Sequence, residues 1–155
     1  MKKYLLSFGA LVLAVMGMTF ASCGDDNDEP YASGSIVGTW ELDDHWFDST
    51  GNYEGFYESS KGYTKFNKDN TYVSVSDLVL TDEWAEISGE QKHQIEIDRG
   101  TYSISGNKCT MNSYTEGESL PFTFEVKGDK IKVIALGLTF TFTRVSDSVI
   151  NKYLD

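Results

Sequence analysis

The side chains of this sequence that could do chemistry are mainly carboxylates. The 155 residues include 24 Asp and Glu, 13 Lys and Arg, and two histidines, which gives a net charge of −11 with the histidines neutral. Pairs such as Asp82 with Glu83, or Glu116 with Glu118, have the composition of a glycosidase acid and its partner carboxylate. A chain with so many acids contains such pairs without any function, so we expect no catalytic residue among them.

The two histidines are the remaining candidates for metal binding or proton transfer. His45 lies in the segment 43–48 (Asp-Asp-His-Trp-Phe-Asp), and His93 follows Gln91 and Lys92. A zinc site needs three or four converging ligands, and one strand cannot supply them because neighbouring side chains point to opposite faces. We expect exposed acids around His45 and a solvent-exposed His93. The sequence also lacks the nucleophile-elbow, phosphate-loop and metalloprotease motifs, so we predict no metal, no cofactor and no enzyme.

Aromatic residues are the better candidates for a binding site. The segment from Asp48 to Lys61 is long for a hairpin connection, and long loops with aromatic side chains are often functional or pack back on their own domain. The candidate rim and lid residues are Trp46, Tyr53, Phe56, Tyr57, Trp84 and Tyr114. Such rings contact sugars as well as flat apolar molecules, and a plug that closes one end of the domain is an equal alternative.

Residues 1–22 have the pattern of a signal peptide. Lys2 and Lys3 precede an almost wholly apolar run from Tyr4 to Phe20, and small residues follow at once. The run of about 17 residues is at the lower limit for a membrane span. A permanent N-terminal anchor is the alternative interpretation.

The cysteine that ends this segment lies in a recognisable motif. Phe20-Ala21-Ser22-Cys23-Gly24 resembles the lipobox of bacterial lipoproteins, which implies cleavage before Cys23 and attachment of fatty acyl chains such as palmitate to it. Cys109 is then left without a disulfide partner, and we expect it to be a small buried hydrophobic residue.

Residues 23–35 are expected to be a polar tether between the lipid and the folded domain. The run Gly-Asp-Asp-Asn-Asp-Glu-Pro at 24–30 is similar to the export tag of Bacteroidota-type lipoproteins that reach the outer face of the outer membrane. We therefore predict a lipid-anchored, surface-exposed outer-membrane protein, with a periplasm-facing location as the alternative. The acidic charge argues against nucleic acids as partners.

The rest of the chain, residues 36–155, is predicted to form one all-β domain of about eight to ten short strands. Apolar and polar residues alternate in successive segments separated by Gly, Asn and Asp turns, as a half-buried strand requires. The clearest apolar faces are Phe122, Phe124 and Val126; Ile131, Val133 and Ala135; and Leu138, Phe140 and Phe142. No segment before the tail has a convincing helical period, whereas residues 147–154 are expected to form a short helix.

Successive hairpins with one apolar face can bury it by closing into an up-and-down barrel, which also removes exposed edges. Four segments in this order resemble the lipocalin-like lipoproteins of Bacteroidota-type bacteria: Gly38-Thr39-Trp40, the run 66–72 (Phe-Asn-Lys-Asp-Asn-Thr-Tyr), the run 100–104 (Gly-Thr-Tyr-Ser-Ile) and the run 139–144. The resemblance implies an eight-stranded barrel with an internal cavity and a lid after the first strand. It implies no particular ligand.

Gly38, Trp40 and Arg144 are expected at the base of this barrel. Arg144 is in phase with Leu138, Phe140 and Phe142 and should point inward, as should Trp40 on the opening strand. Closure brings the first and last strands together, so the guanidinium can lie across the indole face.

The sequence thus predicts a surface lipoprotein whose barrel binds a small apolar or amphipathic ligand. The main alternative is a barrel filled by its own side chains that contacts a protein or glycan through its loops, and an enzyme is the third. Ser49 and Ser148 lie in short motifs that resemble acceptor sites for O-glycosylation in such bacteria.

Overall fold

The computed structural model describes residues 35–43 and 56–155. Their elements, in chain order, are β1 (Gly38–Leu42), β2 (Tyr57–Phe66), β3 (Thr71–Leu80), α2 (Asp82–Ser88), β4 (His93–Ser105), β5 (Lys108–Ser113), β6 (Ser119–Lys127), β7 (Lys130–Ala135), β8 (Leu138–Val145) and α3 (Asp147–Asn151). The predictions for the signal peptide, Cys23, the acidic tether, His45, Trp46, Ser49 and Tyr53 fall outside the described residues. No described helix has the length and apolar content that a membrane crossing requires.

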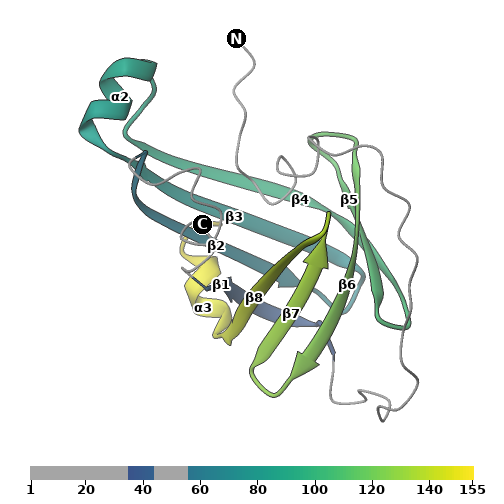
Figure 1. Cartoon of the computed structure of the whole chain (residues 1–155). Helices are drawn as coiled ribbons and strands as arrows, with labels where there is room; N and C mark the ends of the chain where they lie inside the picture. Colours follow the sequence, from purple (N-terminus) through teal and green to yellow (C-terminus); the bar gives the residue numbers. More distant parts are fainter. Residues whose placement is uncertain (1–34, 44–55) are drawn as a thin grey trace.

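The described strands form a closed barrel in which each strand pairs with its neighbours in chain order and β1 pairs with β8. All eight pairings are antiparallel. The ribbon in Figure 1 follows this up-and-down path from β1 to β8. The predicted all-β up-and-down barrel is therefore confirmed, as is the short C-terminal helix, which Ser146 caps by accepting a hydrogen bond from the Ser148 amide.

The expectation that no helix precedes the tail is wrong, because α2 connects β3 to β4. Thr81 caps its first turn by accepting a hydrogen bond from the Trp84 amide, and Gly89 ends it in the left-handed conformation. None of the residues of α2 is buried. The helix is thus defined by its caps and has no apolar face that a periodicity argument would detect.

The alternating strand residues form the apolar core of the barrel. The buried cluster consists of Ile36, Trp40, Phe66, Tyr72, Tyr102, Cys109, Met111, Leu120, Phe122, Val126, Ile131, Val133, Ala135, Phe140 and Phe142, with Leu42 and Phe124 packed against it. Leu138 shares the phase of Phe140 and Phe142, yet it is 39% exposed because it begins β8 beside a turn. The inward faces of β6, β7 and β8 otherwise match the prediction.

The predicted contact at the base of the barrel is confirmed. Trp40 pairs directly with Arg144 across β1 and β8, and the guanidinium carbon lies 4.1 Å from the centre of the indole ring. The guanidinium also donates hydrogen bonds to the carbonyls of Val37 (2.9 Å) and Ser35 (3.2 Å). The indole Nε1 donates to the carbonyl of Ile36 at 2.7 Å. These bonds tie the segment before β1 to the last strand.

Gly38 belongs to the same base for a steric reason. Its φ of +130° is in a region that L side chains rarely adopt, and a Cβ there would overlap the guanidinium of Arg144. A glycine is therefore required where the first strand passes the arginine.

The C-terminal helix packs on the outside of the barrel. Ile150 of α3 is fully buried in a second cluster with Tyr63, Val73 and Val75. Polar contacts hold both ends of the segment: Asp147 accepts a hydrogen bond from Thr39, and the Tyr153 hydroxyl donates to Asp77 at 2.6 Å. This explains why Val73 and Val75 of β3 are buried although they face away from the barrel interior.

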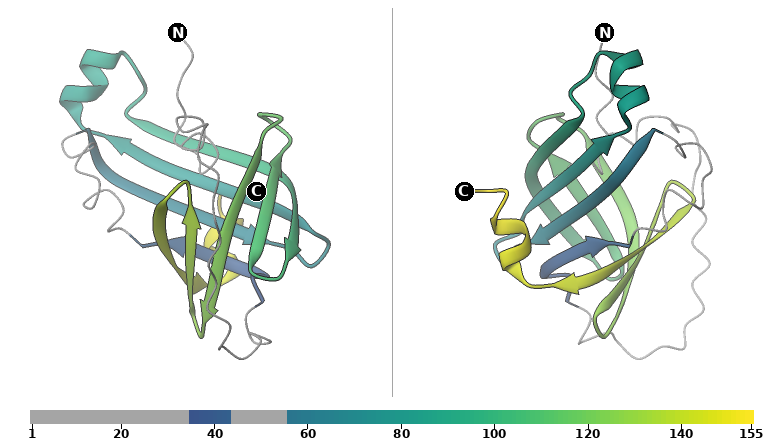
Figure 2. Two further views of the ribbon diagram at one scale, coloured as in Figure 1. Left: turned by 45° about the vertical axis from the view of Figure 1, so that its right-hand side comes forward. Right: turned by 90° about the vertical axis from the view of Figure 1, so that its left-hand side faces the viewer.

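Strands β2, β3 and β4 continue beyond the barrel as a three-stranded sheet. β4 has 13 residues, but its pairing with β5 covers only Gly100–Ser105. In Figures 1 and 2 these long strands run out to α2, on one side of the upright β5–β8 strands. The extension carries the inner wall described below.

Candidate functional site

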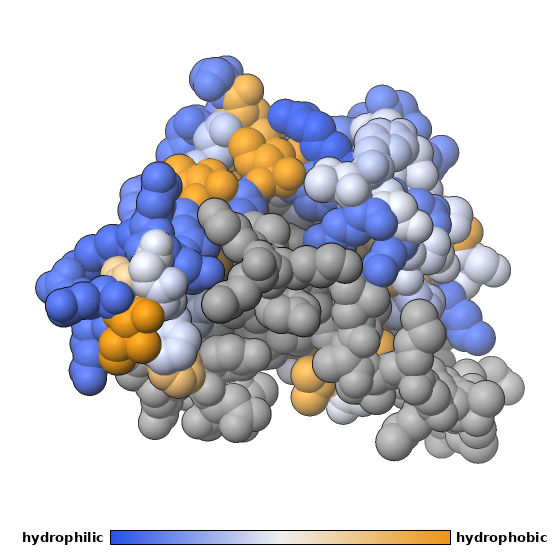
Figure 3. Space-filling model, turned by 90° about the horizontal axis from the view of Figure 1, so that it is seen from above, coloured by the Kyte–Doolittle hydropathy of each residue, from blue (hydrophilic) through white to orange (hydrophobic). Residues whose placement is uncertain are grey.

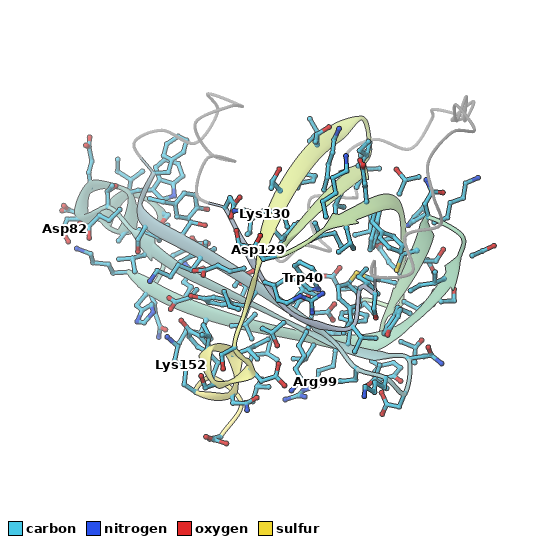
Figure 4. All side chains as sticks on the ribbon, turned by 90° about the horizontal axis from the view of Figure 1, so that it is seen from below. Trp40, Asp82, Arg99, Asp129, Lys130 and Lys152 are labelled. Atoms are coloured by element: carbon cyan, nitrogen blue, oxygen red, sulfur yellow. The ribbon has the colours of Figure 1, made fainter. Side chains whose placement is uncertain are left out.

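The base of the barrel is filled by side chains. A cavity of about 10 Å³ remains there, lined by Trp40, Thr64, Phe66, Phe122, Ile131, Val133 and Phe142. Such a volume holds one water molecule at most. In Figure 4, which looks at the molecule from below, Trp40 lies near its centre, between the strands. A ligand inside this barrel would therefore have to bind above the packed base.

Above the base, the inner wall on β3 and β4 is polar. Ser74 lies opposite Asp98, and Ser76 opposite Glu96, on the face that points into the barrel. Ile95 and Ile97 point outward and are 49% and 39% exposed. Apolar and acidic residues alternate in this strand, and its acids, not its isoleucines, face inward.

Asp98 is the best-enclosed carboxylate of this wall, at 8% exposure. It accepts hydrogen bonds from the hydroxyls of Tyr72 (2.6 Å) and Ser113 (2.7 Å). Burial, together with the hydrogen bond to Asp98 and its charge, raises the pKa of Tyr72 well above its usual range. The tyrosine therefore stays protonated and remains a donor to the carboxylate.

Glu96 differs from Asp98 because hydrogen bonds do not compensate for the burial of its carboxyl group. Its Oε2 atom is buried and has no hydrogen-bond partner among the described residues. Burial, followed by the charges of Glu116 and Glu90, raises the pKa of Glu96 to about 7. Near neutral pH this carboxyl is therefore present in both protonated and ionised forms, and it can donate or accept a hydrogen bond.

Glu116 belongs to the same group of acids. Burial and the neighbouring charges of Asp98 and Glu118 raise its pKa. Glu96 and Asp98 of the inner wall thus interact with Glu116, an exposed residue of the turn after β5, and we call these three carboxyls the carboxyl wall. No group of His, Cys, Asp and Glu suited to a metal ion occurs in the described residues.

The apolar residues Leu78 and Leu80 continue the inner face of β3 toward α2, and both are buried. Phe56 and Trp84 meet at this end, with ring centres 4.3 Å apart, and Thr81 donates a backbone hydrogen bond to the Phe56 carbonyl. The carboxyl wall therefore lies between the aromatic base and a second apolar region near α2.

The predicted rim residues are only partly brought together. Phe56 and Trp84 are in contact, and Tyr57 begins β2 beside them. Tyr114, in the turn after β5, is 68% exposed, and no ring contact joins it to this pair in the described part of the chain. Trp46 and Tyr53 lie outside the described residues.

The other residues considered for chemistry have structural contacts. Asp82 binds Lys92 at 2.7 Å on the surface, where Figure 4 places it at the far end of the extension. The side chain of His93 is 57% exposed, as predicted, and contacts Asp77 at 2.7 Å. Cys109 is buried, which raises its pKa to about 12 and keeps it as a thiol. The Ser148 residue is exposed at the start of α3.

Sequence reasoning missed the carboxyl wall. Polar residues recur at every second position in both strands: Tyr72, Ser74 and Ser76 in β3, and Glu96 and Asp98 in β4. This shared alternation could have indicated the wall, because polar residues on neighbouring strands form one polar face. Comparison of the chain with known protein families and with curated proteins found no match.

Proposed function

We propose that the protein is anchored to the outer membrane through a lipid on Cys23 and presents, on the cell surface, a lipocalin-like barrel that binds a small amphipathic molecule. The anchor and the location are supported by the sequence pattern of residues 1–30. Ligand binding is supported by one observation above all, the buried Oε2 of Glu96 without a hydrogen-bond partner. Burying such a group costs free energy, and a ligand that donates a hydrogen bond to it recovers part of that cost.

The surroundings of Glu96 define the chemistry of the ligand. With Asp98 and Glu116 nearby, the carboxyl wall favours a head group that donates hydrogen bonds and carries positive charge. The apolar residues Leu78 and Leu80, both buried, continue the same inner face toward α2. A molecule with an amine head and an apolar body fits both regions, whereas a carboxylic acid would be repelled when ionised.

The packed base supports a second candidate function. The cavity beside Trp40 has a volume of only about 10 Å³, so it does not accommodate a small apolar ligand. If the upper half also excludes ligands, the protein is an interaction module that contacts a protein or glycan through its loops.

A series of chain-matched probes tests the proposed binding. Dodecylamine, dodecanol and dodecanoic acid share an apolar tail and differ in the head group, and their binding can be followed by tryptophan fluorescence of the full chain. At pH 8 we expect dodecylamine to bind about tenfold more tightly than dodecanol, since hydrogen bonds to charged groups contribute about 1.5–3 kcal/mol. Dodecanoic acid should bind more weakly than either.

The Glu96→Gln variant should remove most of this preference for the amine. Glu86→Gln is the matched control, because Glu86 is an exposed acid of α2 away from the inner wall. Equal binding of the three probes would refute the role of the carboxyl wall. Absence of binding by all three would favour the interaction module.

A further inference from the structure

The upper half of β4 is an open edge of the sheet. Among the described strands, β3 pairs with β4 from Val79, opposite His93, to Thr71, opposite Thr101. β5 pairs with β4 only from Gly100 onward. Ile95 and Ile97 therefore have a described strand on one side only. Figure 1 shows this part of β4 along the margin of the extension.

The backbone groups of Ile95 and Ile97 point toward the open side. In an antiparallel pair, alternate residues direct both their N–H and C=O groups to the same neighbour. Tyr102 donates to Asn70 of the β3 side, and Leu80 donates to the carbonyl of Lys92, so even-numbered residues of β4 bond toward β3. The carbonyl of Arg99, an odd-numbered residue, accepts from Tyr114 on the β5 side. Ile95 and Ile97 thus each offer one donor and one acceptor to a further strand.

This stretch lacks two of the usual protections of an edge strand. Between His93 and Asp98 the sequence contains neither proline nor lysine. Its outward side chains, Ile95 and Ile97, are apolar and exposed. Figure 3 shows exposed hydrophobic side chains in small separate groups among hydrophilic ones, in the view from the α2 side.

The inward acids determine which strand can pair here. In an antiparallel pairing of two copies through Ile95 and Ile97, Glu96 would lie opposite the second copy's Gln94, Glu96 or Asp98. Two of these three registers place like charges opposite one another, which destabilises a sheet. A strand that places Lys or Arg opposite Glu96 gains an opposite-charge pair instead. The net charge of −11 also attracts a basic partner.

We propose that the β4 edge formed by Ile95, Glu96 and Ile97 binds an extended segment of a partner protein in which basic and apolar residues alternate. One of its basic side chains faces Glu96, its apolar side chains lie beside the two isoleucines, and its backbone continues the sheet beyond β4. This interaction shares Glu96 with the proposed small ligand, but the backbone pairing with Ile95 and Ile97 requires no ligand inside the barrel.

Amide hydrogen exchange of the full chain tests this pairing with a defined probe. The probe is an octapeptide in which lysine and valine alternate. We expect it to slow exchange of the Ile95 and Ile97 amides about tenfold or more, while the Gln94 and Glu96 amides, already bonded toward β3, change little. The same peptide with N-methyl groups on its edge-facing residues, and a glutamate–valine peptide, should give no protection.

Two variants complete the experiment. Ile97→Pro removes an N–H that makes no bond to β3, so the barrel should fold while peptide binding is lost. Ile97→Val, which keeps the donor and the apolar side chain, should bind normally. Protection by the N-methylated or acidic peptide, or none by the basic one, would overturn the proposal. Protection that grows with protein concentration alone would identify a second copy as the occupant and would also overturn it.

Discussion

At the scale of single residues, Arg144 and Trp40 close the barrel by linking its last strand to its first. The arginine combines a contact with the indole face at 4.1 Å with two hydrogen bonds to main-chain carbonyls. A lysine has neither the planar group nor the same donors, so it cannot reproduce this arrangement. The pair therefore fixes the register in which the barrel closes.

We expect Arg144→Lys and Trp40→Phe to destabilise the protein non-additively. Their coupling free energy in a double-mutant cycle should be about 1–2 kcal/mol, as for a cation–π contact shielded from water. Urea unfolding of the two single variants, the double variant and the parent chain measures it. Strictly additive losses would show that the contact contributes nothing of its own.

Glu96 makes stability depend on pH in a defined window. Burial raises its pKa in the folded protein from the ordinary value of 4.5 to about 7. The folded state therefore binds this proton more tightly than the unfolded chain does. The stabilisation is complete below about pH 4.5 and is lost as the pH rises through about 7.

We accordingly expect the parent chain to be less stable at pH 8 than at pH 5, and Glu96→Gln to reduce that difference. Part of it should remain, because burial also raises the pKa of Glu116. A hydrogen bond from Thr71 lowers the pKa of Asp69, and one from Thr39 lowers the pKa of Asp147. Both carboxyls therefore titrate below their ordinary pKa of 3.8 and do not contribute to the difference between pH 5 and pH 8. Urea midpoints at the two pH values provide the measurement, and an unchanged difference in Glu96→Gln would contradict the assignment.

At the scale of elements, α3 stabilises the barrel from outside. Ile150 is fully buried against Tyr63, Val73 and Val75. We expect Ile150→Ala to cost about 2–5 kcal/mol of unfolding free energy, the range for deleting a buried aliphatic side chain. Ser148→Ala, at an exposed position of the same helix, is the control. A loss no larger than that of the control would mean that α3 does not pack where the structure has it.

The strands could be predicted from the sequence because burial on one face imposes a period of two on residues such as Phe122, Phe124 and Val126. The same rule could not orient β4, since Ile95, Glu96, Ile97 and Asp98 alternate equally well with either set inside. Their orientation is decided by the register with β3, which places Ser74 and Ser76 beside the acids. The helix α2 was not predicted because none of its residues is buried, so its sequence shows no apolar face with a helical period.

The candidate site could be predicted only in outline for a related reason. Aromatic residues such as Phe56 and Trp84 were recognised by their type, and the structure places them together. The carboxyl wall is formed by residues from β4 and from the turn after β5, which are separated in sequence. Among 24 acids, only the three-dimensional pairing identifies Glu96 and Asp98 as enclosed.

At the scale of the whole molecule, the proposed lipid anchor determines where the protein is located, and the barrel does not need it to fold. We expect Cys23→Ala to abolish labelling by a fatty-acid probe, because the thiol is the proposed acylation site. The barrel should still fold, because its first strand, β1, begins at Gly38, well after Cys23. Labelling that persists in the variant would refute the lipoprotein assignment.

The central claim is that the upper barrel holds an amphipathic molecule at the carboxyl wall, and native mass spectrometry of the full chain purified from its own host tests it most directly. We predict a reproducible adduct that carries a basic head group and that is lost or strongly reduced in Glu96→Gln but kept in Glu86→Gln. A mass without any adduct in the parent chain, together with no uptake of dodecylamine, would contradict the claim.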